Sequence, residues 1–195
     1  EVEDLEALRL TMDLSDTMLD TARNLSRVWG RNWIQSLLTA EQEAIEQTLN
    51  ESPWINGAAF LALKRRLHRF QNFKFLAPQS GGDSVQRIIQ ALAAGTNVIL
   101  EFGRYGNALE AYILVANYLT RRIRLHYVQR VEESLGDESN QPPQLMITIE
   151  EAHKFLDPMI ARQTIFGTIA RELRKFRVTL LIVDQRPSAI DEEVM

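Results

Sequence analysis

The chain has 195 residues, of which 45% are hydrophobic, so it is long and apolar enough to bury a substantial core. It contains no cysteine, which excludes disulfides and thiolate metal sites and fits a cytoplasmic protein; no apolar run reaches the roughly 18 residues of a membrane span, and the acidic N-terminus is unlike a signal peptide. The net charge of −4 excludes a chain that is basic throughout and wraps nucleic acid over its whole surface.

The spacing of apolar residues in the first 80 residues predicts a helical subdomain. Apolar residues recur at steps of three or four from residue 14 to residue 37, which indicates a long helix that can bend at Gly30. A second helix is expected over residues 39–50 and a third over residues 60–70. No catalytic constellation is found within this part of the sequence.

Charge is unevenly distributed along this helical part. Residues 1–51 carry eleven acidic and four basic side chains, a net charge of −7, whereas residues 52–80 carry five basic side chains and no acid. The basic segment has interleaved Phe side chains and could contact the phosphates or bases of DNA. The alternative is an amphipathic helix whose solvated face is basic. The candidate DNA-binding residues are Lys64, Arg65, Arg66 and Arg69.

Residues 81–195 predict an α/β domain, and the turn cluster at residues 78–82 marks its start. Because predicted strands alternate with helices, we expect a parallel sheet with right-handed crossovers. About three strands are expected, which is few for a complete domain of this class. The expected elements are helices over residues 83–95 and 109–131, and buried strands over residues 97–102, 145–150 and 178–184.

Acidic and polar residues follow two of the expected strands. Glu150 and Glu151 come at the end of one, and Gln185 follows another. Ligands bind at the carboxyl ends of strands in open α/β sheets. Glu150 could hold Mg²⁺ near a nucleotide through water, Glu151 could orient or deprotonate an attacking water, and Gln185 could sense the terminal phosphate. The alternative is a strand-to-helix turn whose acids cap the following backbone, with Gln185 as an ordinary polar residue.

The segment between these two strands predicts a helix with a basic side. Asp157-Pro158 is a typical start, and the apolar side over residues 161–176 leaves Arg171 and Arg174 on or near the opposite face. A solvated face is the default interpretation of such charges. In a ring, however, an Arg delivered to a neighbour's nucleotide would stabilise charge on the transferring phosphoryl group. His153 stands alone beside a turn, so it is expected to be a hydrogen-bonding structural residue rather than a ligand.

Three segments taken together resemble the HerA family of DNA-translocating ATPases, in the FtsK-like branch of RecA-fold motors. They are Ile149–Leu156, Ala170–Phe176 and Val183–Ile190, and their order and spacing agree with the family's motifs. The resemblance implies that residues 81–195 are the C-terminal part of a RecA-like P-loop NTPase core with its Walker B and sensor motifs. Residues 1–80 would be the helical insertion of that family.

The resemblance also implies a function. Members of the family form hexameric rings that use ATP and Mg²⁺ to move along double-stranded DNA, often with a NurA-type nuclease. By position, Glu150 would be the Walker B acid, Glu151 the catalytic carboxylate and Gln185 the sensor. This sequence departs from the common pattern in having Glu rather than Asp at position 150, Leu173 where Gly is frequent, and Asp184 where Ser or Thr is frequent.

A phosphate-binding loop of the pattern Gly-x-x-x-x-Gly-Lys-Ser/Thr is missing from the 195 residues. The expectation is therefore a piece of a longer ATPase that lacks this loop, binds ATP weakly and does not hydrolyse it. Two other interpretations stay open. One is a fragment of the related ATPase of conjugative type IV secretion, and the other is a non-enzymatic adaptor with a degenerate NTPase fold.

Overall fold

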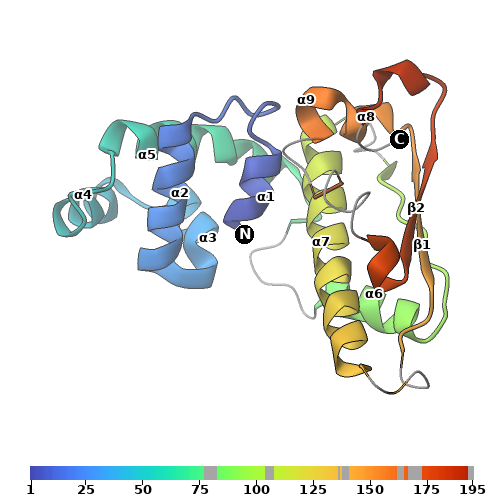
Figure 1. Cartoon of the computed structure of the whole chain (residues 1–195). Coiled ribbons are helices and arrows are strands. Elements are labelled where there is room, and N and C mark those ends of the chain that lie inside the picture. Colours follow the sequence, from blue (N-terminus) through green and yellow to red (C-terminus); the bar gives the residue numbers. More distant parts are fainter. Residues whose placement is uncertain are drawn as a thin grey trace. The chain divides into compact units, whose positions relative to one another are not determined.

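The computed structural model describes residues 1–76, 83–103, 108–135, 137, 141–161, 165–166 and 173–192. The chain separates into two compact units, Glu1–Gln79 and Ser80–Met195. The first unit is helical in its described residues, and the second combines helices with a parallel sheet (Figure 1). Within the described residues, no helix is long and apolar enough to cross a membrane.

The first unit has more helix breaks than the sequence pattern predicts. The helix expected over residues 14–37 is two helices, because the chain breaks at Gly30, whose positive φ of 66° suits a residue without Cβ. The next helix begins at Gln42, not at Thr39, because the Thr39 hydroxyl donates to the carbonyl of Gln35 at 2.9 Å within the preceding helix. The helices are α1 (Val2–Ala7), α2 (Asp16–Trp29), α3 (Trp33–Thr39), α4 (Gln42–Glu51) and α5 (Gly57–Leu67), with 3₁₀ turns at Gly30–Asn32 and His68–Asn72.

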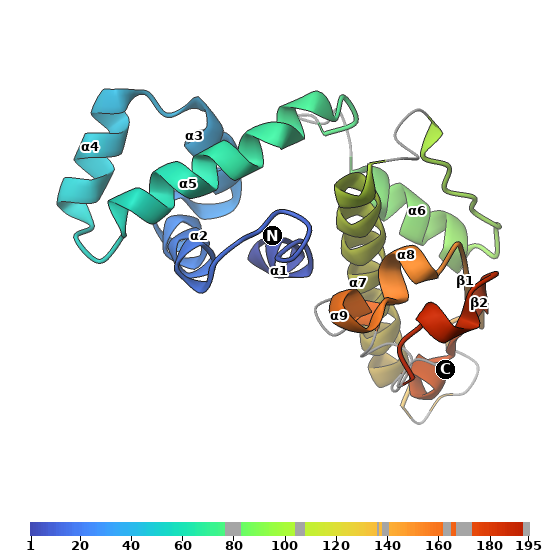
Figure 2. The ribbon, with the colours of Figure 1, turned by 90° about the horizontal axis from the view of Figure 1, so that it is seen from above.

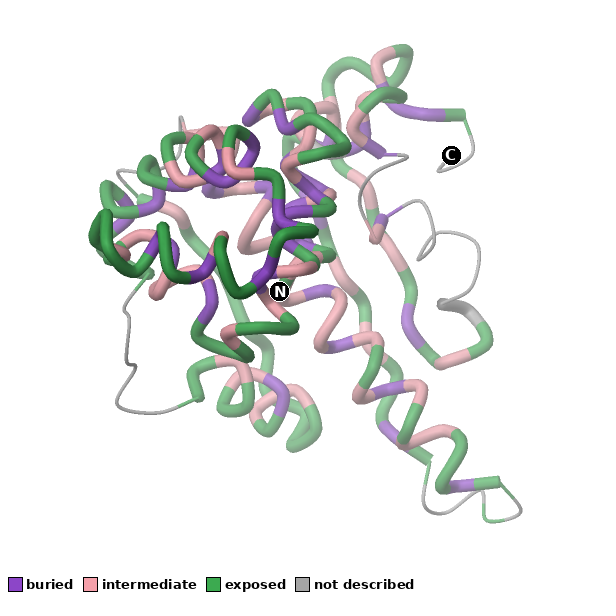
Figure 3. The backbone as a smooth tube through the Cα atoms, turned by 90° about the vertical axis from the view of Figure 1, so that its left-hand side faces the viewer, coloured by how far each residue is buried: buried purple, intermediate pink, exposed green. Residues whose placement is uncertain are grey.

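The core of the first unit forms where α5 packs against α2 and α3. Phe60 on α5 is fully buried and meets the Trp29 ring edge-on, with ring centroids 5.8 Å apart. Buried positions recur along each helix and alternate with exposed ones, as the purple and green stretches of Figure 3 show. The largest fully buried side chains here include Leu5, Leu8, Met12, Leu25, Leu37, Leu63 and Leu67.

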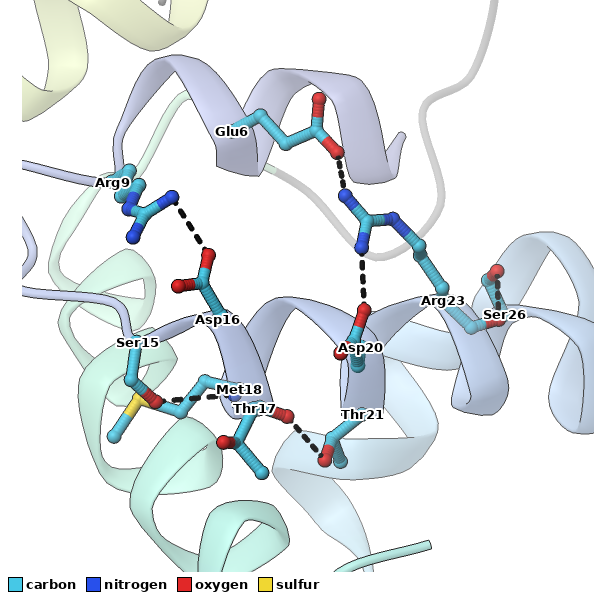
Figure 4. A network of polar contacts seen from close by, with 10 residues as sticks. All are labelled: Glu6, Arg9, Ser15, Asp16, Thr17, Met18, Asp20, Thr21, Arg23 and Ser26. Atoms are coloured by element: carbon cyan, nitrogen blue, oxygen red, sulfur yellow. Dashed lines mark hydrogen bonds and ion pairs between the residues drawn. The ribbon is translucent and has the colours of Figure 1, made fainter. Parts of the chain in front are cut away.

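Ion pairs connect α1 and the turn that follows it to α2 (Figure 4). Arg23 pairs with Glu6 of α1 and, at 2.6 Å, with Asp20 of its own helix. Arg9 pairs with Asp16 at 2.8 Å. All five side chains are substantially exposed, so each pair contributes little to stability. Part of the acidic charge at the start of the chain is therefore partnered within the unit.

The second unit contains both helices that were expected next to its first strand. The Asp83 carboxylate accepts a hydrogen bond from the Gln86 N–H at 3.0 Å and caps the first of them. The elements are α6 (Ser84–Ala93), α7 (Leu109–Glu133), β1 (Leu145–Glu150), α8 (His153–Leu156), α9 (Pro158–Ala161) and β2 (Val178–Val183), with 3₁₀ turns at Leu173–Phe176 and Pro187–Ala189.

The sheet consists of β1 and β2, which pair in parallel from Leu145 opposite Val178 to Glu150 opposite Val183. The helices α6 and α7 lie on one face of this sheet, as Figures 1 and 2 both show. The core beneath that face joins both helices to both strands. It is formed by Ile89, Ile123, Tyr127 and Val178, with Val85, Leu92, Leu119, Leu145 and Ile147 packed around them.

The other face of the sheet is open in the described part of the chain. Alternate side chains of β1 and β2 point there, and Met146, Leu181 and Val183 are 59%, 44% and 47% exposed. This pattern follows from the period of two along a strand. The two strands therefore bury one face only.

The prediction of a third strand over residues 97–102 is wrong. The segment has no regular secondary structure, and Ile99 is 93% exposed. A strand is held by backbone hydrogen bonds to a neighbour and by burial of its side chains. Residues 97–102 lack a strand partner in the described structure, and their apolar composition alone does not supply one. The described sheet accordingly has two strands instead of about three.

Candidate functional site

The residues predicted to form a site follow the two paired strands. Because β1 and β2 are parallel and Glu150 lies opposite Val183, the segments that begin at Glu151 and Asp184 leave the sheet at the same edge. On the β1 side, the chain turns directly into α8. On the β2 side, it passes through Gln185 to the 3₁₀ turn Pro187–Ala189. The sequence prediction that these two strands belong to one parallel sheet is confirmed.

Glu150 and Glu151 are both exposed at this edge, although their backbones differ. Glu150 is the last residue of β1, on the open face of the sheet, whereas Glu151 has a left-handed φ of 54°. For a residue with a Cβ this conformation costs about 1–2 kcal/mol. The Glu151 carbonyl accepts from the Lys154 N–H at 3.0 Å, and its carboxylate lies 3.4 Å from Lys154 Nζ. The turn therefore directs the two neighbouring carboxylates differently.

Asp184 connects the two strand ends. One of its carboxylate oxygens, Oδ2, accepts a hydrogen bond from the His153 N–H at 2.7 Å and lies 2.8 Å from His153 Nδ1. The other, Oδ1, accepts from the Arg186 N–H at 2.6 Å. The Asp184 side chain is only 2% exposed. The expectation that His153 is a hydrogen-bonding residue is thus confirmed, whereas its partner was not identified from the sequence.

These contacts keep Asp184 ionised. Burial alone raises the pKa of this carboxyl, but the hydrogen bonds from the N–H groups of His153 and Arg186 and from the imidazole outweigh it and lower the pKa to about 2. An ionised carboxylate can only accept hydrogen bonds, so His153 Nδ1 must be the donor in this contact. Asp184 thereby selects the imidazole form that carries a proton on Nδ1.

The remaining predicted site residues are placed only in part. Gln185 is exposed beside Asp184. Arg171 lies outside the described residues, and Arg174 is described only as part of the 3₁₀ turn Leu173–Phe176, so a role for either at a neighbour's nucleotide stays a prediction. In the described part of the chain, His, Asp and Glu side chains do not gather in groups of three or more that could hold a metal ion. One or two carboxylates with water still match the way proteins hold Mg²⁺.

The basic segment of the first unit is partly engaged within that unit. Lys64 Nζ donates to the carbonyl of Ala40, and Arg66 forms an ion pair with Asp13. Arg65 and Arg69 are exposed. A hollow of about 730 Å³ lies along one side of α5, lined by Ala58, Leu61, Lys64, Arg65 and His68. DNA contact by Lys64, Arg65, Arg66 and Arg69 remains a prediction, and Lys64 and Arg66 would have to leave their partners inside the unit to make it.

Three curated proteins are similar to this chain, and each is named DNA double-strand break repair helicase HerA. The protein from Sulfolobus acidocaldarius is 37% identical over 84 residues, which cover 42% of this chain and 16% of its own length. The protein from Sulfurisphaera tokodaii is 32% identical over 118 residues, or 60% of this chain and 22% of its own length. The protein from Saccharolobus solfataricus is 39% identical over 77 residues, or 36% and 15%.

These matches show a distant and partial likeness to HerA proteins. The chain spans less than a quarter of the length of each of the three. No protein-family model matches the chain. No solved structure matches it either.

Proposed function

We propose that this chain is part of a HerA-type motor, a cytoplasmic ATPase that couples ATP hydrolysis to movement on double-stranded DNA. The observation that carries the proposal is the pair of parallel strands that ends in Glu150-Glu151 on one strand and Asp184-Gln185 on the other, in a chain similar to three HerA helicases. On this proposal, the second unit belongs to a RecA-like core and the first to a helical insertion. The complete protein would be a homo-hexamer that works with a NurA-type nuclease.

Each exposed group at the strand ends has a role in the proposal. Glu150 would hold Mg²⁺ through water, and the ion would neutralise charge on the phosphates of ATP. Glu151 would orient the attacking water and accept its proton, and Gln185 would bond to the terminal phosphate. Arg171 or Arg174 would reach the nucleotide of a neighbouring subunit. The loop that binds the phosphates would come from a part of the protein outside these 195 residues.

Nucleotide turnover tests the first part of the proposal. The 195-residue chain should bind ATP weakly in the presence of Mg²⁺ and release no phosphate above background at micromolar concentration. Clear turnover that Glu151→Gln abolishes would show that the chain is catalytically complete, against the proposal.

The longer protein tests the second part. Its ATP hydrolysis should be stimulated by double-stranded DNA, lost in Glu151→Gln and retained in Glu132→Gln, which removes an exposed carboxylate on α7 away from the strand ends. Hydrolysis stimulated by single-stranded but not by double-stranded DNA would favour a conjugative secretion ATPase. The absence of hydrolysis together with a missing phosphate-binding loop in the longer protein would favour an adaptor.

A further inference from the structure

The contact between Asp184 and His153 joins the two chain segments that carry the candidate catalytic groups. It involves three donors, namely the backbone N–H and the Nδ1–H of His153 and the backbone N–H of Arg186, and all lie 2.6–2.8 Å from carboxylate oxygens of Asp184. The Asp184 side chain is 2% exposed and that of His153 is 24% exposed. Short, charge-assisted bonds to a carboxylate that is withdrawn from solvent are stronger than exposed ion pairs.

Glu151 and Gln185 flank this contact on its two sides. Glu151 precedes His153 by two residues, and the left-handed turn at Glu151 is closed by the Lys154 N–H on its carbonyl. Gln185 lies between Asp184 and Arg186, which are themselves hydrogen-bonded to each other. One carboxylate therefore constrains the backbone next to both candidate catalytic side chains.

The elements around the contact support the same arrangement. Ala152 and Leu156 are fully buried, and the Leu156 N–H donates to the Ala152 carbonyl at 2.8 Å. Beyond the 3₁₀ turn that follows β2, the Asp191 N–H donates to the Leu156 carbonyl at 2.7 Å. The segment after β2 is thus fastened to α8 at two points, Asp184 and Asp191. Both ends of the segment from Asp184 to Asp191 are therefore hydrogen-bonded to α8.

We propose that Asp184 is a positioning residue, which holds Glu151 through His153 and Gln185 through Arg186 in the relative arrangement that phosphoryl transfer requires. The catalytic role of Asp184 rests on the proposed function. The structural link between the segments of Glu151 and Gln185, here called the coupling, does not depend on it. Positioning matters in such chemistry because catalysis consists almost entirely of placing and electrostatically stabilising the reacting groups.

Nuclear magnetic resonance of the isotope-labelled 195-residue chain tests the coupling directly. In the unmodified chain, His153 should carry its proton on Nδ1. Asp184→Asn should shift the amide resonance of Glu151, and His153→Ala should shift that of Gln185, because in each case the substitution lies on the other segment and acts through the contact. His153→Asn retains an N–H donor near the position of Nδ1 and should restore the Gln185 resonance. Asp157→Asn is the matched control, because the Asp157 carboxylate accepts a local hydrogen bond from the Met159 N–H, two residues further along the chain, and the change should leave both resonances in place.

Titration with ATP and Mg²⁺ then tests whether this positioning matters for nucleotide binding. In the unmodified chain, the Glu151 and Gln185 resonances should respond together with a single apparent Kd. Asp184→Asn should weaken that response about tenfold or more, as expected for residues that orient groups holding a ligand. An Asp184→Asn variant that unfolds more easily but leaves the Glu151 amide resonance unchanged would overturn the inference, because Asp184 would then have only a structural role. Coupled shifts without any response to ATP would support the link between the two segments and contradict the expectation that this chain binds ATP weakly.

Discussion

Replacing Glu151 by Gly tests whether the turn after β1 holds a left-handed residue at this position. The change removes the cost of about 1–2 kcal/mol that a Cβ incurs at a φ of 54°. It also destabilises the folded state by about 0.5–1 kcal/mol, because glycine loses more conformational entropy on folding than other residues. The ion pair with Lys154 is lost as well; the Glu151 side chain is 54% exposed, so this loss is a few tenths of a kcal/mol. The variant should therefore be between unchanged and about 1 kcal/mol more stable.

The matched control is Glu150→Gly, one residue earlier in the chain. Glu150 is the last residue of β1, so glycine relieves no left-handed strain there. The full entropy cost applies, and the control should lose about 0.5–1 kcal/mol. The two variants should thus differ by about 1–2 kcal/mol, although both remove an exposed glutamate from the same strand end.

Urea unfolding can measure this difference in the second unit alone. All four Tyr residues follow residue 80 and all three Trp residues precede it, so tryptophan fluorescence reports the first unit. The near-ultraviolet circular dichroism that remains after the tryptophan transition is subtracted reports the tyrosines of the second unit. The tryptophan transition should be the same in both variants. A Glu151→Gly variant destabilised as much as Glu150→Gly would refute the left-handed turn and, with it, the different orientation of the two carboxylates.

Three further predictions address other parts of the chain. The pKa of Asp184 in the folded protein is about 2, below its ordinary 3.8, so its stabilising effect is complete above about pH 4 and is lost as the pH falls towards 2; Asp184→Asn should remove this pH dependence from tyrosine-detected unfolding. Phe60→Ala should cost about 3–5 kcal/mol by tryptophan-detected unfolding, whereas Leu61→Ala, at a half-exposed neighbour, should change stability by about 0.5 kcal/mol or less. If the basic segment contacts DNA, Lys64→Ala with Arg65→Ala should reduce the slope of log affinity against log salt by about one per lost phosphate contact, and an unchanged slope and affinity would count against it.

Local patterns predicted α6, α7 and the two strands, but they missed α1 and the separation of α2 from α3. The helix expected from residue 157 to residue 176 begins as α9, whereas its last residues, Leu173–Phe176, form a 3₁₀ turn. The Asp83 cap predicted the start of α6, and the apolar spacing predicted α7. The two apolar runs before Glu150 and Asp184 form parallel strands. These features depend on interactions within a few residues or on a side-chain period that can be read directly. For the same reason, the turn that places Glu150 and Glu151 at a strand end was predictable.

Features that depend on tertiary structure were not predictable in the same way. An apolar run over residues 97–102 cannot show whether a neighbouring strand is present, so the third strand was predicted and is not found. The contact of Asp184 with His153 joins residues 31 positions apart, and only the register of β1 against β2 brings them together. In the sequence, this contact is indicated only by Asp184 after one strand and His153 after the other. That signal becomes specific only when the two strands are known to pair.

The open face of the sheet affects how this protein behaves at high concentration. Met146, Leu181 and Val183 form apolar surface on a two-stranded sheet that has an unpaired strand edge on either side within the described residues. A net charge of −4 over 195 residues gives little long-range repulsion, and salt screens it within about 10 Å. We therefore expect attraction between molecules to grow when sulfate is added and to weaken on cooling, since both changes act on apolar hydration. Light scattering during a temperature ramp would measure this association. If Leu181→Lys abolished it, the open face of the sheet would be its source.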